Sequence, residues 1–171
     1  LQALKVGVIG YGIVGGTFAR LLDAMGVTVL AYDKYKTGYA EGGVQECSLQ
    51  ELYTEADVIS LHLPLTAETR DYANADFFHA FKTPVHFINT ARGPILNTVD
   101  LVAALDSGKV LSAGLDVLEY EKSSFTSLFE GPLPPALAAL LERENVLLSP
   151  HVAGWTKESF EKMGAGLAQK V

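Results

Sequence analysis

Three polar side chains follow expected strands of the chain and together could bind an acidic substrate and exchange a proton with it. Arg92 lies in Asn89-Thr90-Ala91-Arg92-Gly93, Glu121 comes shortly after an expected strand at 112–117, and His151 lies in Ser149-Pro150-His151. Because open α/β sheets place their ligands at the carboxyl ends of parallel strands, we expect the three to gather at one edge. Neutral histidine exchanges protons near pH 7, and a guanidinium forms a two-point bond with a carboxylate. The trio therefore suits a substrate that has a carboxylate and a proton to move, although each residue alone would be an ordinary loop residue.

A glycine-rich turn near the start of the chain indicates a dinucleotide site. Gly10-Tyr11-Gly12-Ile13-Val14-Gly15 closes a short apolar strand and opens a helical pattern. In such a turn Gly12 lets the backbone approach a pyrophosphate, and Gly15 lets the helix pack closely. The amides of Ile13 and Val14, with the helix dipole behind them, are expected to point at the phosphates. The alternative is a packing turn that binds no ligand.

An acidic residue after the second expected strand distinguishes between dinucleotides. Asp33 lies 18 residues beyond Gly15, close to the ~20 expected for the acid that binds the adenosine ribose. Its carboxylate would accept hydrogen bonds from the ribose hydroxyls and repel a 2′-phosphate, which favours NAD over NADP. Lys34 and Lys36 weaken this argument, because either could turn toward a phosphate. A solvated carboxylate at a strand end is the alternative for Asp33.

The elements that must position these residues alternate between short β-branched runs and segments of helical periodicity. This pattern predicts an α/β fold with a Rossmann-type, doubly wound parallel sheet of about seven strands in three layers. The expected strands cover residues 5–9, 28–32, 43–46, 57–61, 85–89, 112–117 and 145–149.

Four helices are expected from periodicity and capping residues. The first carries Phe18, Leu21, Leu22 and Met25 and ends at Gly26, and others begin at Ser48, Asn97 and Thr156. The segment 122–144 is long for a connection between a helix and a strand. Within it, Pro134 and Pro135 are expected to start a short helix that turns Leu137, Leu140 and Leu141 inward. The alternative is a lid or a contact with a partner.

Composition excludes several classes of function. The chain has 171 residues, of which 49% are hydrophobic, and its net charge is −7. We expect one domain, 1–171, and no nucleic-acid or membrane-surface partner.

The single cysteine, Cys47, cannot form an internal disulfide, and no Cys/His spacing predicts a metal site. No apolar run reaches the ~18 residues of a membrane span, and together these features predict a cytoplasmic protein. Since the chain opens on a strand without Met, we expect it to be an excised domain.

These blocks together resemble the cofactor-binding domain of the D-isomer-specific 2-hydroxyacid dehydrogenases, a family that includes D-lactate and D-3-phosphoglycerate dehydrogenases. The resemblance is carried by the glycine turn, Asp33, and the blocks 62–66, 89–93, 114–117 and 149–154, with Thr69. It implies NAD as cofactor, a small 2-hydroxy or 2-keto acid as substrate, with 3-phosphoglycerate as one suggestion, and a homodimer.

The resemblance also implies a role for individual residues. Arg92 would bind the substrate carboxylate and keto oxygen, His151 would be the general acid/base, and Glu121 would pair with His151, with Glu119 as a near alternative. His62, beside the dinucleotide in this reading, is equally well explained as a structural histidine. It further implies that the adenosine side of the cofactor is lined by Leu63, Pro64 and Thr69. The residues implied near the nicotinamide and its ribose are Thr90, Ala91, Asp116 and Gly154.

The resemblance also implies a substrate domain, which we expect to lie outside these 171 residues. We therefore expect the isolated chain to bind NAD but to turn over 2-hydroxy acids poorly or not at all. The main rival function is that of a non-enzymatic NAD sensor similar to the corepressors related to this family. The acidic composition and the lack of a basic patch argue against that reading.

Overall fold

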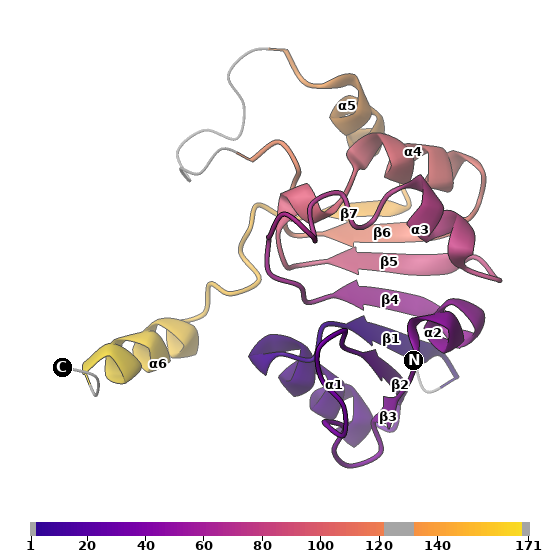
Figure 1. Ribbon diagram of the computed structural model, residues 1–171. Helices are drawn as coiled ribbons and strands as arrows, with labels where there is room; N and C mark the ends of the chain where they lie inside the picture. Colours follow the sequence, from indigo (N-terminus) through magenta and orange to yellow (C-terminus); the bar gives the residue numbers. More distant parts are fainter. Residues whose placement is uncertain (1–2, 122–131, 169–171) are drawn as a thin grey trace.

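The computed structural model describes residues 3–121 and 132–168, and its centre is a parallel sheet in the order β3-β2-β1-β4-β5-β6-β7 (Figure 1). The strands are β1 (Lys5–Ile9), β2 (Thr28–Tyr32), β3 (Gln45–Glu46), β4 (Val58–Leu61), β5 (Val85–Asn89), β6 (Val110–Leu115) and β7 (Val146–Leu148). This is the expected doubly wound fold. The strand order reverses between β1 and β4, which creates a crevice at their carboxyl ends.

Four strands differ from the expected ranges: β4 begins one residue later, β7 is one residue shorter at each end, and β3 and β6 differ by two residues. β6 begins two residues earlier than expected, because a register shift at Val85/His86 lets Val110 pair with Val85. It ends at Leu115 and leaves Asp116 in the following loop. β3 has only two residues, since the amide of Gly43 donates to the Asp23 carboxylate at 3.0 Å instead of extending the strand.

The helices are α1 (Ile13–Ala24), α2 (Leu49–Glu55), α3 (Ala75–Ala80), α4 (Thr98–Asp106), α5 (Pro135–Leu141) and α6 (Lys157–Ala168), with a 3-10 turn η1 (Gly93–Ile95). The caps expected at Ser48, Asn97 and Thr156 are all present. α3 was not expected, although the Asn74 side chain caps it as a sequence signal would predict. Residues 122–131 of the expected irregular segment lie outside the described residues.

Helices cover the two faces of the sheet with separate cores. On one face, α2, α3, α4 and α5 bury a core that includes Leu52, Phe77, Phe78, Leu101 and Leu140. On the other face, α1 packs over β1 and β2 with Ala19 and Leu22. α6 extends away from the sheet (Figure 1).

Leu141, which was expected to face inward, is exposed, and so are two apolar residues that recur at helical spacing in the first helix. In α1 the exposed fractions are 60% for Leu21 and 57% for Met25, because small residues bring this helix close to the sheet over a narrow stripe. In α5, Leu137 is buried as expected, whereas Leu141 is 55% exposed. No helix in the ranges 3–121 and 132–168 is long and apolar enough to cross a membrane.

Candidate cofactor site and catalytic cluster

The glycine turn joins β1 to α1, and its three glycines differ in what a side chain would meet. Gly10 has φ +96°, and a Cβ there would lie 2.6 Å from the carbonyl oxygen of His62. A Cβ on Gly15 would lie 2.0 Å from the carbonyl oxygen of Gly10. The fold therefore requires glycine at these two positions. A Cβ on Gly12 would meet nothing within 4 Å. The fold therefore does not require glycine at this position, but the absence of a side chain leaves room for a ligand to approach the backbone of the turn.

The first turn of α1 offers free backbone donors beside Gly12. Gly12 is the N-cap and has no side chain to accept from the first amides, and no acidic residue lies in the first turn. Ile13 is 92% exposed. Unpaired amides at the positive end of a helix dipole bind phosphate groups. The turn thus fits a pyrophosphate.

A cavity of about 580 Å³ opens beside the turn, at the carboxyl ends of β1, β2 and β4. Its size is in the range of small-molecule sites. Seven of the predicted cofactor residues line it: Gly10, Gly12, Asp33, His62, Leu63, Pro64 and Thr69. Further residues line the cavity that were not predicted from the sequence, among them Tyr32, Leu49, Glu68 and Tyr72. Tyr32 was detectable, since it ends the strand that leads to Asp33.

Backbone amides fix the Asp33 carboxylate at the rim of this cavity. Oδ2 accepts from the amide of Tyr11 at 2.8 Å, and Oδ1 accepts from the amide of Tyr35 at 3.0 Å. Each carboxylate oxygen keeps a second lone pair for a ribose hydroxyl. The two neighbouring lysines are engaged elsewhere: Lys36 donates to the carbonyl of Tyr11 at 2.7 Å, and Lys34 pairs with Glu68.

His62 fits both interpretations offered for it. Its Nε2 lies 3.0 Å from the hydroxyl of Ser60, and its ring lies against Phe18 with centroids 5.2 Å apart. Burial lowers the pKa of His62 to about 4, so the ring is neutral at pH 7. It is thus a hydrogen-bonded structural histidine that also lines the cavity.

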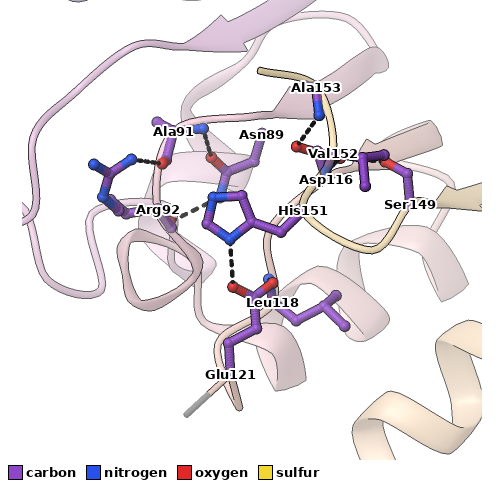
Figure 2. A network of polar contacts seen from close by, with 10 residues as sticks. All are labelled: Asn89, Ala91, Arg92, Asp116, Leu118, Glu121, Ser149, His151, Val152 and Ala153. Atoms are coloured by element: carbon purple, nitrogen blue, oxygen red, sulfur yellow. Dashed lines mark hydrogen bonds and ion pairs between the residues drawn. The ribbon is translucent and has the colours of Figure 1, made fainter. Parts of the chain in front are cut away.

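The expected histidine–carboxylate pair lies at the same edge of the sheet (Figure 2). Nδ1 of His151 is 2.9 Å from Oε2 of Glu121, and both side chains are partly buried. The other carboxylate oxygen accepts from the amide of Leu118 at 2.7 Å, which fixes its orientation. Glu119, the alternative partner, instead accepts from the amide of Thr98 at 2.8 Å. The structure therefore pairs Glu121 with His151.

Asp116 anchors the loop that carries His151. Its Oδ1 accepts from the Ser149 hydroxyl at 2.6 Å and from the Val152 amide at 2.9 Å, and Oδ2 accepts from the Ala153 amide at 2.9 Å. Burial alone would raise the pKa of Asp116, but these hydrogen bonds and the nearby His151 hold it below its ordinary value. The anchor supports a left-handed backbone at His151, with φ +54°. Both oxygens of this carboxylate thus accept hydrogen bonds from the protein itself. A direct contact between Asp116 and the cofactor stays a prediction.

A buried asparagine shapes the loop that carries Arg92. Oδ1 of Asn89 accepts from the amide of Ala91 at 3.0 Å, and Nδ2 donates to the carbonyl of Arg92 at 3.1 Å. A Cβ on Gly93 would lie 1.8 Å from the carbonyl of Leu118, so this loop packs directly against the one that leads to Glu121. The exposed Arg92 guanidinium donates to the Ala91 carbonyl at 2.6 Å and pairs with no carboxylate among residues 3–121 and 132–168. It remains available to an anion.

The predicted residues thus form two groups at one edge of the sheet. The residues expected on the adenosine side line the cavity. Those expected near the nicotinamide and the substrate lie outside it, in the loops after β5, β6 and β7: Thr90, Ala91, Arg92, Asp116, His151 and Gly154. No His, Cys, Asp and Glu in the described part of the chain cluster in a way that could hold a metal ion.

The glycine turn, the carboxylate after β2 and the cavity at the switch point define a Rossmann-type dinucleotide-binding domain. The family model described as the NAD-binding domain of D-isomer specific 2-hydroxyacid dehydrogenases matches residues 1–153. The chain belongs to this family and is its NAD-binding domain, which confirms the resemblance and the predicted cofactor.

Known relatives cover nearly the whole chain. A D-lactate dehydrogenase of Lactiplantibacillus plantarum is 38% identical over 166 residues, which is 95% of this chain and 50% of the relative. A hydroxypyruvate reductase of Blautia hydrogenotrophica is 37% identical and matches 95% of this chain and 48% of its own length. The crystal structure of the NAD-complexed D-isomer specific 2-hydroxyacid dehydrogenase from Lactobacillus delbrueckii ssp. bulgaricus superposes with a TM-score of 0.89 at 32% identity. That match covers 99% of this chain and 52% of the other. The chain thus spans about half the length of these relatives.

Proposed function

We propose that the protein containing this chain is an NAD-dependent D-2-hydroxyacid dehydrogenase, and that this chain supplies both the cofactor site and three residues that act on the substrate. The observation that carries the proposal is the 2.9 Å pair between His151 and Glu121. The loop that leads to Glu121 packs directly against the loop of Arg92. Nucleotide binding alone does not require a histidine–carboxylate pair close to a guanidinium that pairs with no carboxylate within residues 3–121 and 132–168 (Figure 2).

Arg92 is positioned to orient a carboxylate substrate. Its exposed guanidinium can form a charge-assisted fork with the two carboxylate oxygens of a 2-keto or 2-hydroxy acid. Asn89 holds the backbone on both sides of the Arg92 Cα through its two amide hydrogen bonds. Such a fork fixes C2 of the substrate relative to the cofactor, and positioning of this kind lowers the barrier without any bond change in the protein.

His151 is positioned to move the proton. Bound NAD supplies the hydride acceptor, or NADH the donor, at C2 of the substrate. In oxidation, neutral His151 takes the proton of the 2-hydroxyl group on Nε2, because Nδ1 faces Glu121. The carboxylate of Glu121 stabilises the resulting imidazolium and fixes the ring. In reduction, the imidazolium returns that proton to the keto oxygen.

We propose a small 2-keto acid such as pyruvate as the substrate. The relatives reported above are named for D-lactate and hydroxypyruvate, and both are short carboxylic acids that Arg92 and His151 could bind in the same way. The suggestion of 3-phosphoglycerate has no support in these names. The homodimer implied by the resemblance also stays a proposal, which light scattering on the whole protein tests.

A keto-acid screen with NADH on the whole protein tests the proposal, with pyruvate, hydroxypyruvate and phosphohydroxypyruvate as substrates. We expect oxidation of NADH with at least one of them, and its loss in His151→Gln while NADH still binds. His86→Gln is the matched control, since His86 bonds to Ser112 within the sheet. NADH oxidation by none of the acids would favour the sensor function. Turnover of His151→Gln within a few-fold of the wild type would exclude His151 as the base.

A further inference from the structure

A single glutamate links two loops at the rim of the adenosine cavity. Glu68 lies in the loop after β4, and its two carboxylate oxygens bind different partners in the loop after β2. One oxygen pairs with the ammonium of Lys34, and the other accepts from the hydroxyl of Tyr35. Nζ of Lys34 also lies 5.6 Å from the centroid of the Tyr35 ring. All three residues line the cavity.

The loop after β2 has an acidic residue that favours NAD and two lysines that could favour NADP. Asp33 repels a 2′-phosphate, but Lys34 and Lys36 are close enough in the chain to attract one. A phosphate dianion on the adenosine ribose would lie beside the Asp33 carboxylate, within reach of side chains as long as lysine. Asp33 alone therefore does not explain why this cavity would prefer NAD.

We infer that Glu68 is a second determinant of NAD selectivity, which acts by holding Lys34 away from the ribose and adding a negative charge at the rim. Tyr35 keeps the carboxylate in place, so that Glu68 does not follow Lys34 toward a bound anion. Lys36 is held by the carbonyl of Tyr11 and needs no such partner. In this arrangement two carboxylates face the 2′ position and neither lysine is free.

The expected effect is moderate, because the pair lies at the surface. Both side chains are about half exposed, and ion pairs of this kind are individually weak. Loss of Glu68 removes the repulsion of a phosphate dianion by a nearby carboxylate and also frees a cation to bind it. We expect these two changes together to alter the relative affinity for the two dinucleotides by about ten-fold, which corresponds to ~1.4 kcal/mol.

Fluorescence titration of the whole dehydrogenase with NADH and with NADPH tests this inference. In Glu68→Gln the ratio of the Kd for NADPH to the Kd for NADH should fall by about ten-fold relative to the wild type. Glu68→Ala is a second variant that should shift the ratio in the same direction. In Lys34→Gln the ratio should stay within about three-fold of the wild type, because Lys34 is already engaged by Glu68.

The double variant separates the two parts of the argument. With Lys34→Gln added to Glu68→Gln, most of the gain for NADPH should disappear, since the freed cation is gone. Glu55→Gln is the matched control, because it breaks another surface pair, with Lys5 at 2.7 Å, away from the cavity. An unchanged ratio in both Glu68 variants would refute the inference, as would a full shift that persists in the double variant. The readout is cofactor binding, so it does not depend on the proposed substrate or catalytic roles.

Discussion

Replacement of Asp116 by asparagine tests the claim that a buried carboxylate positions the loop that carries His151. Asp116 is 5% exposed and accepts three hydrogen bonds from residues 149–153. In Asp116→Asn the amide oxygen can keep the two donors that meet at Oδ1. The side-chain nitrogen of the asparagine then faces the backbone N–H of Ala153, and because both groups are donors no hydrogen bond forms between them. One bond to a charged acceptor is lost, at ~1.5–3 kcal/mol, and the other two weaken because the acceptor becomes neutral.

We expect Asp116→Asn to lower the free energy of unfolding by about 3 kcal/mol at pH 7, after the smaller cost of burying an amide is included. Urea denaturation measures this change, and hydrogen exchange at the Ala153 amide reports whether the loop itself opens. Turnover should fall as well, since the left-handed backbone of His151 loses its support. Asp106→Asn is the control, because Asp106 is exposed and pairs with Arg143 at the surface. It should cost less than ~1 kcal/mol.

The pH dependence of the stability difference between wild type and Asp116→Asn provides a further test. The pKa of Asp116 lies below its ordinary value of 3.8, so its ionised form is bound more favourably in the folded state. The stability it contributes is complete above the ordinary carboxyl pKa and is lost as the pH falls through the lowered value. The difference between wild type and Asp116→Asn should therefore narrow in acid. A difference below ~1 kcal/mol at pH 7, or one that does not narrow in acid, would contradict the reasoning.

Three further predictions follow from the site. Glu121→Gln should reduce kcat by at least ten-fold with a smaller effect on NADH binding, whereas Glu119→Gln should leave turnover nearly intact; equal losses in steady-state assays would contradict the pairing. Gly12→Ala should fold normally but bind NADH at least ten-fold more weakly, while Gly15→Ala should also lose stability, and circular dichroism with NADH titration separates the two. His62 has its pKa lowered to about 4 from 6.5, so the stability it contributes is complete above pH 6.5 and falls by ~3 kcal/mol toward pH 4. His62→Gln should flatten this part of a plot of unfolding free energy against pH, and an unchanged slope would refute the assignment.

Local sequence patterns were sufficient for the fold class and the cofactor. The alternation of β-branched runs and helical periodicity predicted the doubly wound sheet, because strands that are buried on both faces are predominantly apolar. The glycine turn was readable because its spacing is a local pattern: Gly10 has a positive φ, and a Cβ on Gly15 would meet the carbonyl of Gly10 only five residues earlier. Helix α3 was missed because it has only six residues, too few to show a period.

Side-chain exposure was less predictable from periodicity. Leu21 and Met25 recur at helical spacing with Leu22, yet three of the four buried residues of α1 are glycine or alanine and Leu22 is the fourth, so the outer part of the apolar stripe stays exposed. A helix that packs closely through small residues buries a narrower stripe than one that packs through large side chains. The spacing of apolar residues in the sequence does not show how closely the helix packs against the sheet.

By itself the sequence determined which chemical groups this protein has and at which end of which strand each one lies. Arg92, His151 and Asp33 could be singled out because strand ends in a parallel sheet share one edge. Only the tertiary structure decided which groups meet. Glu121 rather than Glu119 reaches His151, Asp116 supports the loop, and Lys34 is held by Glu68. These pairs join loops that lie about thirty residues or more apart. Their geometry depends on how the sheet twists and how the loops pack, which no local pattern of residues records.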